Sequence, residues 1–564
     1  MNEENIFIEQ AEYINEVLFR KWNIDHPDEE VIVKKLSQGG AKLITGPRGC
    51  GKTTLMLKTY YKLCSQKRGS TLAIYVNFKT SLKIEPLYRK NINASYWFNQ
   101  WLLLKIYQGL YKTLDNINIE PPKDLLLNKV QIDDVINKIE LGFMEKVNMD
   151  TILTISMLEE EINKILSCTN KNHCVLLLDD AAHAFSVEQQ YDFFEFFRQI
   201  KSRIISPKAA IYPGITNYSS TFHVGHDAEE IDVWIKPEMA NYSEFMLKIL
   251  ERRLPRYIYN KLSEQLDLLY IICYSSFGIP RALLNMVSSL YKDKTTNDIE
   301  EYEVKFTRQT VMKAISQTYT QVMNIFLSLK DKLPIYEKFV ISGEQIFIKM
   351  VEEIKEYNKE RSIDEQCVTI AIKKPLPSEL SKVIEFFQYA GLVMYKKELS
   401  KGEKGVFELY DIHYSALIER NAFMGKKSIK SMDLAIALRK RNAHSFKRIT
   451  ANVLIGTDDI RSIFPLSLPP CPVCGTPRAS EHTKFCGECG TALKTASIFE
   501  ELVSNDISKL PLTTKRVQSI KKYSRIRTIK DILMDNDNRE LRGVPQIGPY
   551  WAEKIYSYAE EYIG

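Results

Sequence analysis

The eight residues from Gly46 to Thr53 constrain the fold of this chain more than any other stretch. They read Gly-Pro-Arg-Gly-Cys-Gly-Lys-Thr, a complete match to the phosphate-binding loop pattern. Residues 41–45 before the loop predict a short strand, and the residues from Thr53 onward predict an amphipathic helix. This order of strand, loop and helix indicates an α/β sheet whose loop meets phosphates at a helix N-terminus.

The loop supplies most of the groups that we expect to bind a nucleotide. Its glycines allow backbone N–H groups to close around the phosphates. Lys52 would reach the β- and γ-phosphates, and the Thr53 hydroxyl would bind Mg²⁺. The expected cofactors are therefore ATP and Mg²⁺, and the predicted nucleotide-binding residues of this stretch are Gly46, Pro47, Arg48, Gly49, Cys50, Gly51, Lys52, Thr53 and Thr54.

Two aspartates follow a second apolar run. The sequence Cys-Val-Leu-Leu-Leu at 174–178 suits a central parallel strand buried on both faces, and it ends in Asp179 and Asp180. We expect Asp179 to hold Mg²⁺ and Asp180 to polarise the attacking water, because ligands bind at the carboxyl ends of such strands. Aspartate is one methylene shorter than glutamate, so ATP that is held and only slowly hydrolysed is an alternative.

Two further polar residues complete the predicted catalytic set of Lys52, Asp180, Asn217 and Arg281. Asn217 ends the strand-like run 208–217, where its amide would lie beside the γ-phosphate; alternatively it only shapes a turn with Thr216. Arg281 follows Gly278-Ile279-Pro280 at a predicted helix start, from which its guanidinium could bind the phosphates.

Together these motifs resemble AAA+ ATPases, most closely the origin-recognition-complex group and its relatives among the STAND signalling ATPases. The resemblance covers roughly residues 10–300 and implies a Rossmann-like sheet followed by a helical lid. It also implies that the six residues Lys52, Thr53, Asp179, Asp180, Asn217 and Arg281 carry those families' roles. The Asp-Asp pair is more similar to the STAND branch. No arginine lies between Arg203 and Arg252, where many AAA+ proteins place a finger that acts on a neighbouring subunit.

Changes of pattern along the chain predict a multidomain α/β plus α protein. Within the ATPase part, Trp97, Trp101, Leu104 and Tyr107 recur at spacings of three and four, which is typical of a packed helix face. The predicted parts are an ATPase core at 1–235 with a helical insertion at about 85–165, a helical lid at 236–325, a winged-helix-like domain at 326–422, a basic linker at 423–465, a zinc ribbon at 466–494 and a helix-hairpin-helix domain at 495–564.

The winged-helix prediction depends on one helix and one hairpin. Ser378 is a good N-cap for a helix that Gly391 would end, and residues 392–397 and 406–412 read as two strands. This order resembles a winged helix, a domain that commonly follows the lid in the families named above. Such wings bind DNA in some proteins and only pack between domains in others, and the pattern leaves both open.

Four cysteines predict a structural zinc site. Cys471, Cys474, Cys486 and Cys489 form two C-x-x-C pairs, each followed by a glycine that permits a tight turn. Four thiolates in a tetrahedral array suit Zn²⁺ and leave no open position for catalysis. The segment is similar to small zinc ribbons, and metal binding should drive its folding.

The last segment resembles the helix-hairpin-helix family and the C-terminal domain of the RNA polymerase alpha subunit. In such hairpins the amides after a glycine, here Gly548, face a DNA phosphate, whereas Gln546 replaces the usual earlier glycine. A protein-binding role for the segment is the alternative. Both this segment and the preceding linker are rich in basic residues that could attract phosphates. The predicted nucleic-acid contacts are Arg439, Lys440, Arg441, Lys515, Arg516, Lys521, Lys522, Arg525, Arg527 and Gly548.

Composition excludes some classes of protein. No apolar run is long enough to cross a bilayer, and the N-terminal residues are acidic rather than signal-like, so we expect a cytoplasmic protein without a membrane partner. The leading expectation is a DNA-associated ATPase switch that contacts mainly the backbone of duplex DNA. The alternative is a STAND-like signalling or defence ATPase whose C-terminal modules bind a protein partner; the oligomeric state is left open.

Overall fold

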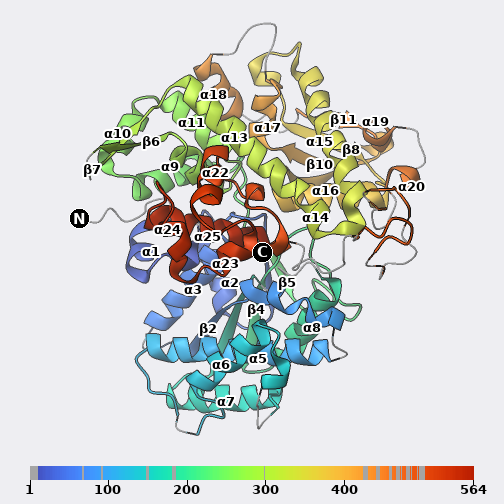
Figure 1. Ribbon diagram of the computed structural model, residues 1–564. Coiled ribbons are helices and arrows are strands. Elements are labelled where there is room, and N and C mark those ends of the chain that lie inside the picture. The colour runs from blue at the N-terminus through green and yellow to red at the C-terminus, as the bar shows by residue number, and fades with distance from the viewer. Residues whose placement is uncertain are drawn as a thin grey trace.

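The computed structural model contains an α/β sheet covered by helices and further, mainly helical parts beside it (Figure 1). No described helix is both long and apolar enough to span a membrane. The structure describes residues 10–66, 69–90, 93–122, 124–147, 152–180, 186–296, 299–423, 430–439, 445–456, 460–464, 470–471, 473–477, 483, 485–491, 493 and 502–563.

A parallel five-stranded sheet forms the first part. Its order is β2-β3-β4-β1-β5, and every pair of neighbours in it is parallel. The loop strand β1 therefore lies between two strands that come later in the chain. This sheet fits a P-loop AAA+ fold and confirms the predicted α/β core. The strands are β1 (Lys42–Thr45), β2 (Thr71–Asn77), β3 (His173–Asp179), β4 (Ile205–Ala210) and β5 (Glu229–Asp232).

Helices cover the sheet, and the predicted insertion between β2 and β3 is helical. Trp101, Leu104 and Tyr107 are fully buried and Trp97 is partly buried, which confirms the predicted packed face. Gly109 lets the helix α5 (Ala94–Asn116) approach the sheet, because a Cβ on Gly109 would lie 2.7 Å from the Tyr75 carbonyl oxygen of β2. The helices of the first part are α1 (Glu16–Trp22), α2 (Glu29–Ser37), α3 (Lys52–Ser65), α4 (Leu87–Lys90), α5 (Ala94–Asn116), α6 (Lys129–Glu140), α7 (Ile155–Cys168) and α8 (Val187–Ile200).

A helical part follows the sheet, as the sequence predicts for a lid. A β-hairpin that the sequence analysis did not predict interrupts it before the last helix. The elements of this part are α9 (Tyr242–Arg253), α10 (Arg256–Ser263), α11 (Leu266–Ser275), α12 (Pro280–Ser288), β6 (Tyr291–Thr296), β7 (Ile299–Val304) and α13 (Arg308–Leu327).

The next part contains the predicted helix and β-hairpin. Gly391 ends the helix with a φ of 82°, as predicted. The N-cap prediction was wrong, because the helix begins at Ser378 itself after Pro377, and the Ser378 hydroxyl donates to Glu379. The elements are α14 (Leu329–Lys332), α15 (Glu337–Asn358), β8 (Thr369–Lys373), α16 (Ser378–Ala390), β9 (Val393–Ser400), β10 (Val406–Ile412) and α17 (Tyr414–Glu419).

Helix α16 packs against the ATPase core. Lys382 Nζ donates to the Gly214 carbonyl oxygen at 2.8 Å, and a Cβ on Gly214 would lie 2.3 Å from the Glu385 carbonyl oxygen. The rings of Tyr389 and Tyr212 meet edge to face, with centroids 5.9 Å apart. Helix α16 thus contacts the sheet-containing part directly, while contact of the β9–β10 hairpin with DNA stays a prediction.

Of the stretch 423–465, which we expected to be a basic linker, the described residues 430–439, 445–456 and 460–464 form helices and a strand. Leu434 and Leu438 bury one side of α18 (Ser431–Arg439), and the short strand β11 (Lys447–Ile449) pairs with β8 in the sheet β11-β8-β10-β9. Apolar residues between the lysines and arginines provide that packing surface. Two short helices, α19 (Ala451–Ile455) and α20 (Ile460–Ile463), follow.

The C-terminal segment is helical, as predicted. Its helices, red in Figure 1, lie between the blue ATPase core and the green and yellow parts, and contacts between residues described below join them to the core. They are α22 (Thr514–Tyr523), α23 (Ile529–Leu533), α24 (Arg539–Arg542) and α25 (Pro549–Ile563).

Candidate functional site

The predicted loop joins β1 to α3, with its lysine at the first position of the helix. Lys52 is buried, and its Nζ donates to the carbonyl oxygens of Gly46 at 2.7 Å and Pro47 at 3.1 Å. Burial lowers the pKa of Lys52, while Cys50, Asp180 and Asp179 raise it. The loop thus folds around its own ammonium group, which a phosphate would draw away from the two carbonyls.

Asp179 ends β3 beside the predicted magnesium-binding threonine. Its Oδ2 accepts from the Tyr75 hydroxyl at 2.8 Å, and a hydrogen bond from Thr53 also stabilises the carboxylate. Burial, with the charges of Asp180 and Glu12, nevertheless raises the pKa of Asp179 to about 7. A hard dication placed here would bind oxygen ligands and relieve the repulsion between the carboxylates.

Asp180 directly follows the strand in a left-handed conformation, with a φ of 51°. Such a backbone is uncommon for residues other than glycine and is often found at functional sites. The carboxylate Oδ1 accepts from the Tyr212 hydroxyl at 3.0 Å, and Oδ2 accepts from the Asn77 amide at 3.4 Å. Two neighbouring strands therefore orient the side chain that we expect to polarise water.

Tyr212 is a site residue that the sequence analysis missed. Its ring lies under Lys52, with Nζ 3.8 Å from the ring centroid, and its hydroxyl reaches Asp180. Strand β4 ends at Ala210, before the Pro213-Gly214 turn, so Tyr212 and not Asn217 stands at the exit of the strand. A tyrosine directly after an apolar strand was the available signal.

Asn217 is not among the residues that line the pocket at the loop. Its Nδ2 donates to Gln190 Oε1 of α8 at 2.8 Å and to the Ile215 carbonyl oxygen at 3.2 Å. Thr216 stabilises the same turn, because its hydroxyl donates to the Tyr212 carbonyl oxygen at 2.8 Å. The role of Asn217 beside the γ-phosphate stays a prediction, while the contacts seen are those of a turn.

Arg281 lies at the start of the lid helix α12, against the loop. Its backbone N–H donates to the Gly49 carbonyl oxygen, and a Cβ on Gly49 would lie 2.8 Å from Arg281 Cβ. With a φ of 83°, position 49 needs glycine both for its backbone conformation and for this approach. The lid arginine is therefore next to Arg48 and the loop, where the sequence predicts it.

A single pocket connects these groups to an apolar recess. Asn23 and His26 also line it, and the buried Asn23 Oδ1 has no hydrogen-bond partner among the described residues. His26 is held by its ring nitrogens, which contact the Val233 carbonyl oxygen at 3.3 Å and the Asp28 backbone N–H at 3.0 Å. The apolar lining comes from the N-terminal segment, the core and the lid: Ile14, Phe19, Trp22, Ile24, Ile235, Phe245, Ile249 and Leu284.

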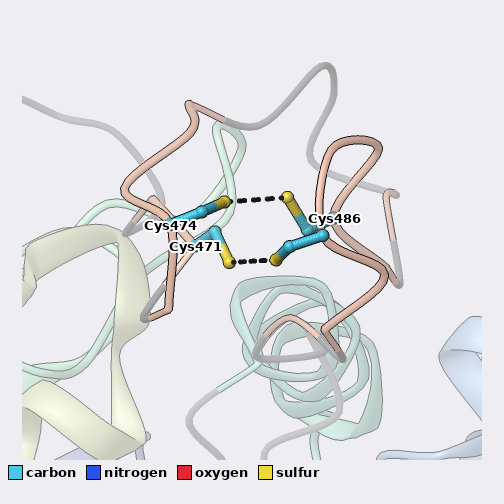
Figure 2. Close-up of side chains that lie close together, drawn as sticks. Cys471, Cys474 and Cys486 are labelled. Atoms are coloured by element: carbon cyan, nitrogen blue, oxygen red, sulfur yellow. Dashed lines mark hydrogen bonds between the residues drawn. The ribbon is translucent and has the colours of Figure 1, made fainter.

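The four predicted zinc ligands meet in a second site (Figure 2). Their sulfur atoms all lie within 4.8 Å of one another, with Cys471 Sγ 3.4 Å from Cys489 Sγ and Cys474 Sγ 3.4 Å from Cys486 Sγ. Hydrogen bonds from the Thr476 side chain and backbone lower the pKa of Cys474 to about 6. Four converging sulfurs with one thiol prone to ionise suit a tetrahedral Zn²⁺.

The two cysteine pairs have the same backbone geometry. Cys471 N–H donates to the Thr476 carbonyl oxygen at 3.0 Å, and Cys486 N–H donates to the Thr491 carbonyl oxygen at 2.8 Å. Gly475 and Gly490 follow with φ values of 72° and 68°, as the predicted tight turns require. The repeat of one turn around both pairs supports a single site made from both.

The predicted nucleic-acid residues of the tail have different surroundings. Lys515, Lys522 and Arg525 are exposed, whereas the Arg516 guanidinium lies 3.4 Å from the centre of the Trp551 ring and Lys521 pairs with Asp506 at 2.7 Å. Exposed Arg527 donates to the carbonyl oxygens of Ser524 and Ile526.

Gly548 is exposed at the start of α25, and Ala552 N–H donates to its carbonyl oxygen at 3.0 Å. Gln546, at the position of the usual earlier glycine, has a φ of 66°. Arg439 of α18 stacks on Tyr270, 4.1 Å from the ring centre, and Lys440 and Arg441 lie outside the described residues.

Comparisons with known proteins give limited matches. No family model and no curated protein matches the sequence. Three similar solved structures are the Aeropyrum pernix ORC1 protein in complex with DNA (12% identity, 71% of this chain and 93% of that chain, TM-score 0.24), Cdc6p from Pyrobaculum aerophilum (11%, 72% and 98%, 0.28) and Drosophila ORC bound to DNA (11%, 72% and 97%, 0.24).

The class of the fold rests on the order of the sheet and the position of the loop, and does not depend on those three structures. A parallel sheet with the loop strand between β4 and β5, two aspartates at the end of β3 and a helical part that meets the loop at Gly49 fit a P-loop fold of the AAA+ type.

Proposed function

We propose that the protein binds MgATP at the loop and couples its binding and hydrolysis to the engagement of duplex DNA by the C-terminal modules. The observation that supports this most directly is the convergence of Lys52, Thr53 and the Asp179-Asp180 pair at one edge of the sheet. Lys52 and the loop amides would bind the phosphates, and Thr53 with Asp179 would hold Mg²⁺, which neutralises the charge that develops during phosphoryl transfer.

Asp180 would act on the water that attacks the γ-phosphate. The Tyr212 hydroxyl and the Asn77 amide donate to its carboxylate and orient it. Within this proposal Tyr212 is a positioning residue, because it connects Asp180 with the lysine that binds the phosphates.

The apolar recess would hold the base. The partnerless Asn23 Oδ1 is an acceptor, which suits the amino group of adenine and would repel the carbonyl oxygen that guanine carries there. Competition between ATP and GTP for the protein, measured with Asn23→Asp as a variant that keeps the acceptor and Asn23→Leu as one that removes it, tests this assignment. Equal preference for ATP in the native protein and the leucine variant would reject it.

DNA binding is proposed from the exposed Lys515, Lys522 and Arg525 and from Gly548 at the start of α25. Contacts of this kind read the phosphate backbone, so the affinity for duplex DNA should fall steeply as salt is added. A tail that binds a protein partner instead would show no such dependence and no affinity for DNA at low salt.

Steady-state ATP hydrolysis with and without duplex DNA tests the whole proposal. We expect turnover that DNA increases, that Asp180→Asn reduces by at least about a hundredfold and that Lys52→Ala abolishes by weakening nucleotide binding. Tightly held ATP without turnover, in either condition, would reject the ATPase and favour a binding switch.

A further inference from the structure

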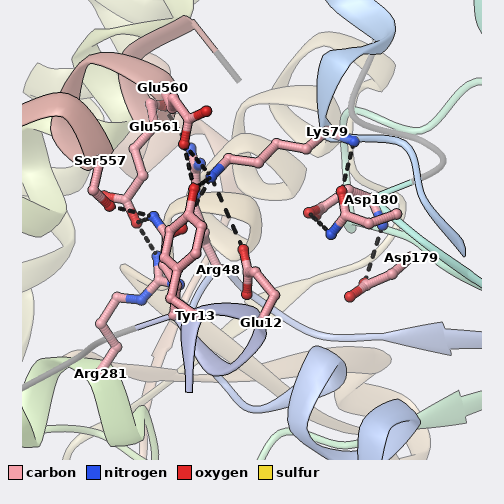
Figure 3. Close-up of polar contacts among 12 residues, drawn as sticks. Glu12, Tyr13, Arg48, Lys79, Asp179, Asp180, Arg281, Ser557, Glu560 and Glu561 are labelled. Carbon is pink, nitrogen blue, oxygen red and sulfur yellow. Dashed lines mark hydrogen bonds and ion pairs between the residues drawn. The ribbon is translucent and has the colours of Figure 1, made fainter. Parts of the chain in front are cut away.

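The last turn of α25 lies beside Arg48 and Arg281, although it is far from the loop in sequence (Figure 3). Glu561 Oε1 pairs with Arg281 at 2.9 Å, and the Glu561 carbonyl oxygen accepts from Arg48 at 3.2 Å. Glu561 is itself among the residues that line the pocket. One acidic residue of the tail thus contacts both arginines that face the phosphate-binding loop.

The N-terminal segment and the core hold the same turn from the other side. Gln10 Nε2 donates to Ser557 Oγ at 2.8 Å and to Glu561 Oε1 at 2.9 Å, and Lys79 pairs with Glu560 at 2.9 Å. The Tyr13 hydroxyl also donates to Glu560. Figure 3 shows Tyr13, Lys79 and Arg281 converging on the two glutamates.

The position of the two glutamates is unfavourable for the helix alone. The C-terminal end of a helix carries a partial negative charge, so cations are preferred there, yet the last turn of α25 has no basic residue. Burial favours the neutral form of Glu561, but Arg281 and Arg48 outweigh burial and lower its pKa. The interactions that stabilise two carboxylates at this end come from the pocket.

Carboxylate and phosphate oxygens compete for the same guanidinium groups, because both accept paired hydrogen bonds from arginine. We propose that the last turn of α25 is an internal competitor of the nucleotide: Glu561 occupies Arg48 and Arg281 in the absence of ATP, and the phosphates displace it when ATP binds. This inference rests on the proposed binding of ATP at the loop and adds the group that ATP must displace.

Displacement of Glu561 would loosen the C-terminal end of α25. After Glu561 leaves Arg281, contacts with Gln10, Tyr13 and Lys79 still hold the turn. Gln10 and Lys79 line the pocket, as Glu561 does, so the docked turn would lie beside a bound nucleotide. ATP binding therefore loosens α25 from the core, and the docked α25 weakens ATP binding.

The test uses the full chain with Glu561→Gln, which keeps the shape of the side chain and removes its charge. The matched control is Glu553→Gln, the same change on an exposed position of the same helix. ATP affinity is measured by calorimetry with Mg²⁺ present. We expect Glu561→Gln to bind ATP roughly fivefold to tenfold more tightly, the effect of losing one partly exposed charge-assisted hydrogen bond. Glu553→Gln should match the native protein.

Hydrogen exchange of residues 549–563 in the native protein gives a second readout that needs no variant. ATP should speed exchange in the last turns of α25, and Glu561→Gln should speed it without ATP. If the native protein and Glu561→Gln bind ATP with equal affinity, or if bound ATP leaves exchange in α25 unchanged, the competitor is overturned while ATP binding stands. If neither protein binds ATP, both this inference and the proposed function are rejected.

Discussion

Gly278 lies in the turn between α11 and α12, the helix that carries Arg281, and packs against the core. Gly278→Ala should weaken both stability and ATP binding. The residue has a φ of +75°, and a Cβ there would lie 1.8 Å from the Ile235 carbonyl oxygen and 3.3 Å from Trp234 Nε1. Its N–H also donates to the Tyr242 hydroxyl at 2.9 Å. Neither the backbone of Ile235 nor the Trp234 ring can move far, since both are buried.

Two costs add at this position. A left-handed conformation costs alanine about 1 kcal/mol more than glycine. Forcing an atom into a packed site costs typically about 1–3 kcal/mol more. We therefore expect Gly278→Ala to lower the free energy of unfolding by about 3 kcal/mol, measured by urea unfolding followed by tryptophan fluorescence. The shift of α12 should also reduce ATP affinity, because the positions of Arg281 and Gly49 depend on it.

Gly142→Ala separates the two costs. Gly142 has a φ of +77°, and a Cβ there would meet nothing within 4 Å, so this change carries the backbone cost alone. It should lower stability by about 1 kcal/mol and leave ATP affinity unchanged. Equal losses of stability in the two variants would show that the close packing around Gly278 adds no cost, which would refute the prediction.

Other features of the structure lead to three further expectations. Purified protein should carry one zinc ion per chain by elemental analysis, and Cys486→Ser should lose it while Cys168→Ser, at an exposed cysteine outside the cluster, retains it. Burial lowers the pKa of Lys208 from 10.5 to about 7. Between these two pH values Lys208 is protonated in the unfolded chain but neutral in the folded one, so stability should rise with pH across this range. Lys208→Met should flatten that rise. Gln546→Gly should raise stability by about 0.5 kcal/mol, because glycine adopts the φ of 66° without strain, whereas Gln518→Gly within the exposed face of α22 should lower it by a similar amount.

Local patterns in the sequence predicted the parts of the site that are contiguous in the chain. The loop, the buried run before Asp179, the turn before Arg281 and the paired cysteines each combine a residue type with a short spacing. The structure brings the loop, the Asp179-Asp180 pair and Arg281 together at one site, and it brings the four cysteine sulfurs together at a separate site. Such predictions succeed because the chemistry and the local backbone are specified by the same few residues.

The missed residues depend on packing between distant segments. Glu561 meets Arg281 across 280 positions, and no pattern near the end of the chain indicates that partner. Tyr212 is placed by where β4 ends, and the predicted strand extended to Asn217. Likewise the basic stretch before the cysteines indicated a linker, because its charges are more conspicuous in sequence than the buried Leu434 and Leu438.

Helix α25 links two ends with different surroundings. Its 15 residues span about 22 Å, from the exposed turn at Gly548 to the docked Glu561. A straight helix moves as a rigid rod, so a tilt of about 10° about the docked end moves the first turn by roughly 4 Å. Successive phosphates of a DNA strand are spaced about 3.4 Å apart along the axis. A small change at the pocket would therefore move the first turn of α25 by about the spacing of one nucleotide, were the proposed duplex bound there.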